Sequence, residues 1–236
     1  MIELYYSSSP NVLKVMIALE EMGLDHVLRF VDLSKGEQFD PAKLAGSPTA
    51  KVPVIRDDRP GDGGAPLTVF ESGAIMEYLA AKAGRLLPTA PRERIEVMQW
   101  LNWQVANLGP IGGQFWHFER FADRLEPGTD FTYPRRRYRR MLNAIWDVMN
   151  RRLAEAEFLA GAYSIADIAC IPWVRYLDFA PSERPALARW HDAISARPAV
   201  ERAYRKSAAF KTEYGRNERQ GVAYPFEGLA RHTLVS

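Results

Sequence analysis

A serine, a proline and an asparagine stand together at Ser9, Pro10 and Asn11, directly before apolar residues at helical spacing. Ser and Asn are common N-cap residues and Pro is favoured in a first helical turn, so the segment predicts a helix start. A first turn also offers unpaired N–H groups and the positive end of the helix dipole, which can hold an anion such as a thiolate. From the residues alone, Ser9 and Asn11 are therefore either a helix cap or an anion-holding pair, and one position can serve both purposes.

Two more motifs in the same half of the chain have binding chemistry. Glu71-Ser72 precedes a helical pattern, so the Ser72 hydroxyl and N–H can hold a carboxylate while Glu71 pairs with an ammonium group. The alternative is a helix start with a favourably placed acid. Val52-Pro53 opens an extended segment, where a proline ordinarily marks only the entry of a strand.

The composition narrows the range of functions. The chain has 236 residues, 47% hydrophobic and 25% charged, with a net charge of +2, which argues against a nucleic-acid binder. Neither an apolar run of about 20 residues nor a signal-peptide pattern is present, so we expect no membrane association and a cytoplasmic location. The histidines are too scattered for a metal site, and we expect no metal.

Cys170 is the only cysteine, which excludes an intrachain disulfide and fits a reducing compartment. It lies within an apolar helical pattern, so it is interpreted as inert packing rather than as a redox centre.

The first part of the chain predicts a small α/β domain over 1–83. Strand, helix and strand follow one another within about 30 residues, which indicates a βαβ unit with a parallel strand pair. A Gly- and Pro-rich turn then separates two strands of a hairpin, and a helix follows. Room for one more helix remains between the second and third strands. The expected strands are 2–6, 27–31, 52–55 and 67–70, and the expected helices are 12–22 and 71–83.

The rest of the chain lacks strand-like alternation and predicts an all-helical bundle. Gly and two Pro mark 84–92 as a linker, 93–209 as the helical domain, and 210–236 as a polar tail. Ser164 and Asp167 form the pattern of a capping box, which is a structural device.

A run of arginines, Arg135–Arg137 followed by Arg139 and Arg140, is the strongest charge feature. The ordinary interpretation is the solvated face of a helix. A nucleic-acid patch is the alternative, but the small net charge does not support it.

Four motifs recur in order along the chain: Ser9-Pro10-Asn11, Val52-Pro53, Phe70–Ile75 around Glu71-Ser72, and Tyr163–Ala169 around the capping box. Each is weak alone, but in this order and spacing they resemble the cytosolic glutathione transferases, up to about residue 207. The resemblance implies a thioredoxin-like α/β domain followed by an all-α helical bundle. Ser-Pro-Asn, standing where relatives have a catalytic Tyr or Cys, is most similar to the bacterial nu class and the yeast prion-type transferases.

Three further segments resemble the nu class: Lys35–Phe39, Asp62–Gly64 and Leu108–Pro110. One position departs from the pattern, because relatives often have Gly where this chain has Glu37.

The resemblance assigns roles to residues. Ser9 and Asn11 would hold the glutathione thiolate as the catalytic pair, and Val52 would contact the cysteinyl unit beside a cis Pro53. An arginine near Arg137 would reach the ligand across a dimer interface. Residues implied to bind glutathione are Gln38, Lys51, Val52, Pro53, Glu71, Ser72 and Arg137, and Trp116 and His117 would line the pocket for a hydrophobic electrophile.

The implied activity is a glutathione-dependent transferase that reduces disulfide bonds with bound glutathione thiols, in a homodimer. Glutathione or glutathione disulfide would be the co-substrate, and the second substrate a small disulfide or hydrophobic compound. Conjugation of hydrophobic electrophiles and dehalogenase- or etherase-like chemistry are alternatives. A non-catalytic binding module on the same fold is another.

Overall fold

A computed structural model describes residues 1–214, which form two compact units. The first unit contains residues 1–85 together with the helix that starts at Pro198, and the second contains Leu86–Arg197. Each unit is described by itself. The tail expected at 210–236 lies outside the described residues from 215 on, whereas 210–214 are helical.

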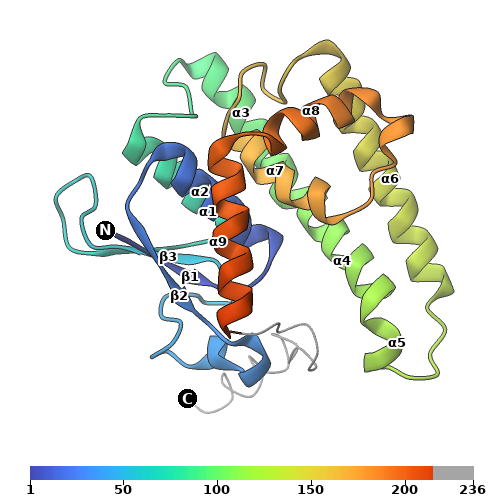
Figure 1. Ribbon diagram of the computed structural model, residues 1–236, viewed down its shortest axis with the longest axis horizontal. Helices are drawn as coiled ribbons and strands as arrows, with labels where there is room; N and C mark the ends of the chain where they lie inside the picture. Colours follow the sequence, from blue (N-terminus) through green and yellow to red (C-terminus); the bar gives the residue numbers. More distant parts are fainter. Residues whose placement is uncertain (215–236) are drawn as a thin grey trace. The chain divides into compact units, whose positions relative to one another are not determined.

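The first unit is built on a four-stranded mixed sheet with the strand order β2-β1-β3-β4 (Figure 1). As the sequence predicts, β1 and β2 are parallel, and α1 connects them. The β3–β4 hairpin is antiparallel and adds to the β1 edge. The elements are β1 (Ile2–Tyr6), α1 (Pro10–Met22), β2 (His26–Phe30), β3 (Val54–Asp57), β4 (Leu67–Phe70) and α2 (Ser72–Ala83).

Helices α1 and α2 each end at a glycine in the left-handed conformation. Gly23 has φ 67° after α1 and Gly84 has φ 62° after α2, a conformation that a side chain disfavours. Helices α1 and α2 contact each other beside the sheet, and their apolar faces are fully buried. The motif at Ser9 lies at the start of α1, and the motif at Glu71-Ser72 lies at the start of α2.

No α-helix forms between β2 and β3; two short 3-10 helices, η1 (Leu33–Lys35) and η2 (Glu37–Phe39), occupy that connection. Gly36 between them has φ 74°, which breaks the helical path. Because Gly36 supplies the left-handed turn, Glu37 itself needs no positive φ. The Glu37 carboxylate also accepts a hydrogen bond of 2.8 Å from the Asp32 N–H.

Helix α9 (Pro198–Tyr214) returns to the first unit and packs on α1. The Tyr6 hydroxyl lies 2.8 Å from the Ser207 hydroxyl, and the ring of Phe210 meets that of Tyr6 edge-on at 5.1 Å. Glu20 of α1 accepts a 2.9 Å hydrogen bond from Arg202 and a second from Lys206. The α/β unit is therefore completed by residues more than a hundred positions away from α1.

The second unit is helical, as the sequence predicts. Asp167, completely buried, accepts hydrogen bonds from Ser164 N–H at the start of α7, from Leu159 N–H and from Trp190 Nε1. Burial raises the pKa of its carboxyl to about 6. The elements are α3 (Pro91–Trp103), the π-helix η3 (Gln104–Leu108), α4 (Gly109–Arg120), α5 (Ala122–Leu125), α6 (Thr132–Glu155), α7 (Ile165–Tyr176), the 3-10 helix η4 (Pro181–Glu183) and α8 (Pro185–Ser195).

Across residues 1–214, none of the helices is both long and apolar enough to span a bilayer.

The Glu20 contacts predict a pH-dependent contribution to stability. Burial raises the pKa of Glu20, but the hydrogen bonds from Lys206 and Arg202 outweigh it and hold the pKa below its ordinary value of 4.5. The stabilisation is therefore present above pH 4.5 and is lost as the pH falls through the lower folded-state pKa. We expect Glu20→Gln to reduce the free energy of unfolding by about 1–2 kcal/mol at pH 7.

Urea unfolding of the wild type and Glu20→Gln at pH 7 and at pH 3.5 measures this effect. The difference between the two proteins should shrink at the lower pH. An equal difference at both values would show that the Glu20 charge does not anchor α9.

Candidate functional site

A small polar cavity of about 70 Å³ lies in the first unit, where α1 and α2 begin. Asn11 reaches it from the first turn of α1, and Glu71 and Ser72 reach it from the start of α2. The full lining is Asn11, Ser47, Thr49, Lys51, Val52, Pro53, Phe70, Glu71 and Ser72. Three of the motifs singled out in the sequence thus meet at one place.

Ser9 is the N-cap of α1, and its hydroxyl accepts a 3.2 Å hydrogen bond from the Val12 N–H. It is absent from the cavity lining, whereas Asn11, two residues later, is present. The serine hydroxyl keeps its own proton for donation while it accepts this bond. Ser9 therefore caps α1 and still has a proton to donate, and Asn11 is the residue of this motif that lines the cavity.

The Val52–Pro53 peptide bond is cis, which confirms what the resemblance implies. Val52 packs against the small apolar cluster of Val31, Leu44 and Val54. The loop before it is fastened by Ser47, whose hydroxyl donates to the Lys51 carbonyl and accepts from the Lys51 N–H, both at 2.9 Å. Val52 is thus held at the cavity from both sides.

Glu71 has a positive φ of 66° although it is not a glycine. Its carbonyl accepts a 2.9 Å hydrogen bond from the Ile75 N–H, while its side chain makes no capping bond to the helix. Ser72, the first residue of α2, is 8% exposed and lines the cavity. The first N–H groups of a helix have no acceptor within the helix, so this end of α2 attracts an anion.

Gln38 was also implied as a ligand-binding residue, and it lies in η2, outside the cavity lining. Its side chain is only 4% exposed, and no described residue donates a hydrogen bond to its Oε1. Sequence reasoning missed Ser47, Thr49 and Phe70, which line the cavity. Phe70 directly precedes Glu71 and belongs to the motif at Phe70–Ile75, so the sequence motif already indicated that Phe70 lies near the site.

The remaining candidates lie in the second unit. On α4, Trp116 packs against Tyr176 with ring centroids 4.2 Å apart, and burial lowers the pKa of His117. On α6, Arg137 is exposed, whereas the neighbouring Arg135 forms an ion pair of 2.6 Å with Asp123. Arg139 pairs with Glu119 at 2.9 Å, so the arginine run covers a solvated helix face with part of its charge neutralised.

Cys170 is fully buried in α7. In the part of the chain that the structure describes, no three His, Cys, Asp or Glu side chains gather as a metal site would need.

Two family models match this sequence. Residues 8–82 match the glutathione S-transferase N-terminal domain, and residues 132–193 match the C-terminal domain. The chain is 45% identical over 213 residues to the disulfide-bond oxidoreductase YfcG of Escherichia coli, covering 88% of this chain and 96% of that protein. The chain belongs to the glutathione S-transferase family. Residues 8–82 of the first unit belong to the thioredoxin-like N-terminal domain of this family, and residues 132–193 of the second unit belong to its helical C-terminal domain.

Solved glutathione transferases have the same fold. A structure from Burkholderia graminis, with two glutathione molecules bound per subunit, has a TM-score of 0.80 at 38% identity and 86% coverage of each chain. A structure from Pseudomonas putida, with one glutathione disulfide per subunit, has a TM-score of 0.80 at 35% identity. It covers 86% of this chain and 90% of that chain.

The positive φ of Glu71 predicts that this residue lowers the free energy of unfolding of the protein. A side chain in this conformation costs about 1 kcal/mol or more, which glycine does not incur. We therefore expect Glu71→Gly to leave the free energy of unfolding unchanged or to raise it by up to about 1 kcal/mol. Ala74→Gly, at an exposed position inside the same helix, is the matched control and should lower it by about 1 kcal/mol.

Chemical unfolding of the two variants and the wild type makes the comparison. A loss of stability in Glu71→Gly equal to that in Ala74→Gly would contradict the inferred strain.

Proposed function

We propose that this glutathione transferase reduces disulfide bonds with the thiols of bound glutathione. The observation that carries the proposal is the cavity at which the starts of α1 and α2 meet the cis Val52–Pro53 bond. Glutathione has two carboxylates, one ammonium and one thiol, and the cavity offers a matching group for each. The disulfide-bond oxidoreductase name of the Escherichia coli relative favours disulfide chemistry over other reactions of the family.

In this proposal Ser72 and the first N–H groups of α2 bind the γ-glutamyl carboxylate, and Glu71 pairs with the ammonium group. The backbone of Val52, beside Pro53, hydrogen-bonds the cysteinyl unit as an added strand would. Lys51, which lines the cavity, and Gln38, which lies in η2 outside its lining, are the residues proposed for the glycyl carboxylate. In a homodimer, which is part of the proposal, Arg137 of one subunit would reach the ligand of the other.

Asn11 and Ser9 hold the thiolate at the start of α1. The side-chain amide of Asn11 and the hydroxyl of Ser9 can each donate a hydrogen bond to sulfur, and the helix dipole lowers the pKa of the bound thiol. Pro10 fixes the turn that separates the two side chains. These groups stabilise an anion and form no bond to the substrate themselves.

The reaction then proceeds as two thiol–disulfide exchanges. A glutathione thiolate attacks one sulfur of the substrate disulfide and releases the other as a thiolate that takes up a proton. A second glutathione thiolate attacks the mixed disulfide, which yields glutathione disulfide and the second substrate thiol. Two glutathione thiols supply both electrons, so the buried Cys170 takes no part.

The second substrate and the location complete the proposal. Trp116 and His117, both on α4, would contact the small disulfide or hydrophobic substrate. A cytoplasmic location supplies the reduced glutathione on which the reaction depends.

The relative rates of two reactions test the proposed activity. With glutathione present, 2-hydroxyethyl disulfide should be reduced faster than 1-chloro-2,4-dinitrobenzene is conjugated, in kcat/KM. The physical reason is that a thiolate-holding helix start activates glutathione without building a site for an aryl leaving group. Faster conjugation would assign the protein to the other chemistry of its family.

Variants of the α1 start test the thiolate site. Replacing both Ser9 and Asn11 by Ala should lower kcat about 100-fold, with a change in glutathione KM of less than about threefold, because the lost bonds act on the thiolate. Asn11→Ala alone should account for most of the loss, since Asn11 lines the cavity and Ser9 does not. Ser9→Ala, as the matched single variant, should mainly lower the melting temperature through the lost cap. Unchanged turnover in the double variant would remove both side chains from the mechanism.

A further inference from the structure

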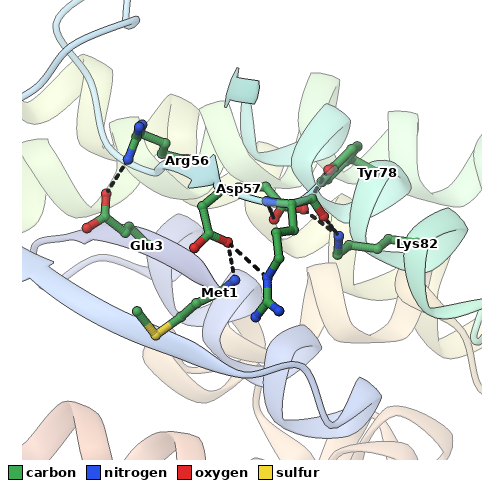
Figure 2. A network of polar contacts seen from close by, with 8 residues as sticks. Met1, Glu3, Arg56, Asp57, Tyr78 and Lys82 are labelled. Atoms are coloured by element: carbon green, nitrogen blue, oxygen red, sulfur yellow. Dashed lines mark hydrogen bonds and ion pairs between the residues drawn. The ribbon is translucent and has the colours of Figure 1, made fainter. Parts of the chain in front are cut away.

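Asp57 is a fully buried carboxylate at the end of β3 that takes no part in the proposed reaction. A buried charge is costly unless it is paired and hydrogen-bonded. Its Oδ2 accepts a 2.7 Å hydrogen bond from the Tyr78 hydroxyl and lies 2.7 Å from Lys82 Nζ. Its Oδ1 accepts a 3.0 Å hydrogen bond from the Arg59 N–H. Figure 2 shows the polar ends of Tyr78 and Lys82 turned toward this carboxylate.

Both side-chain partners come from α2. Tyr78 and Lys82 are four residues apart, so they lie on one face of the helix, near its C-terminal end. Lys82 also donates a hydrogen bond to the carbonyl of Arg59. Burial raises the pKa of Asp57, but the bonds from Lys82 and Tyr78 outweigh it and hold the pKa below its usual range. These three side chains are called the Asp57 clamp below.

The clamp joins the far ends of the two elements that form the cavity. Strand β3 follows Val52–Pro53 directly and ends at Asp57. Helix α2 begins at Ser72 in the same cavity and carries Lys82 in its last turn. At about 1.5 Å per residue, Ser72 and Lys82 are roughly 15 Å apart along a stiff helix. Because the helix is stiff, a shift along its axis at the clamp would therefore displace Ser72 by the same distance.

Apolar packing alone does not fix that axial position well. Ile75, Met76 and Leu79 bury α2, but hydrophobic contact is non-directional and tolerates small sliding. Hydrogen bonds weaken steeply with distance and angle, so the two bonds from α2 to Asp57, made by Tyr78 and Lys82, restrict sliding much more strongly. The hydrogen bonds that hold α2 to the end of β3 thus lie at the ends of these two elements that are far from the cavity.

We infer that Asp57, Tyr78 and Lys82 are positioning residues for glutathione, which hold Ser72 and Glu71 in register with Val52. The inference rests on the proposed function for the identity of the ligand. It assigns the clamp no contact with glutathione. The clamp acts by setting the spacing between Val52 and Ser72, which must match the spacing of the groups that they bind on one tripeptide.

Tyr78→Phe is the decisive variant, because it removes one hydrogen bond and keeps the ring. We expect the Kd and KM for glutathione to rise about three- to tenfold, while kcat at saturating glutathione changes less than about twofold. Lys82→Met should have the same effect. If the clamp contributed only stability, a smaller folded fraction would lower kcat and leave KM unchanged.

Ser207→Ala is the matched control. It removes the buried hydrogen bond between Ser207 of α9 and Tyr6 of β1 in the same unit, a bond in which neither β3 nor α2 takes part. This variant should lower the melting temperature and leave the Kd for glutathione unchanged. Asp57→Asn is the stronger change, and Tyr78→Phe decides the question if that protein does not fold.

A second measurement needs no ligand. In ligand-free protein, the backbone amide resonances of Val52 and Ser72 should shift in Tyr78→Phe and stay in place in Ser207→Ala. This readout separates the two proposals, because a wild type that binds no glutathione would refute the function and still leave the clamp testable. Unshifted resonances together with an unchanged Kd in Tyr78→Phe would overturn the clamp, as would equal shifts in both variants.

Discussion

The site depends on one constraint: the starts of two helices must be held side by side at one end of a four-stranded sheet. A helix start presents N–H groups without acceptors and a positive partial charge, but only to a ligand within about one turn. Asn11 from α1 and Ser72 from α2 line the same cavity, so one ligand can meet both helix starts. A tripeptide with an anionic sulfur and an anionic end fits that arrangement better than a compact anion does.

Two features of the first unit that are unfavourable by themselves accompany this arrangement. Glu71 stays at a positive φ, and Asp57 keeps a charge in the interior with three hydrogen-bond donors around it. Helix α9 packs against α1, where the Glu20 carboxylate accepts hydrogen bonds from Arg202 and Lys206. These features place and stiffen α1 and α2, and we propose that the cavity between their starts holds glutathione. The lone cysteine, buried in the other unit, is separate from both roles.

Local patterns in the sequence predicted the four strands, α1 and α2 of the first unit to within about two residues at each end. The strand over 2–6 and the hairpin strand over 67–70 match β1 and β4, and Gly23 and Gly84 end their helices as expected. The third helix allowed between β2 and β3 was not found, because left-handed Gly36 divides that segment into two short turns. The return of α9 was invisible as well, since its contacts with Tyr6 and Glu20 are tertiary and leave no periodic signal.

The candidate site was predictable to the level of motifs and not of side chains. Three motifs met in one cavity, yet a capping serine and a thiolate-holding serine share one sequence pattern, and only the geometry distinguished Ser9 from Asn11. Ser47 and Thr49 were missed because a loop's path is set by its fastening bonds, here between Ser47 and Lys51.

A crystal structure of this protein with glutathione tests the central claim most directly. The account predicts the γ-glutamyl carboxylate on Ser72, the cysteinyl backbone paired with Val52, and the sulfur within hydrogen-bond distance of the Asn11 side chain. Disulfide reduction further predicts two glutathione molecules, or one glutathione disulfide, in each subunit. A single glutathione bound elsewhere, or with its sulfur turned away from the start of α1, would contradict the account.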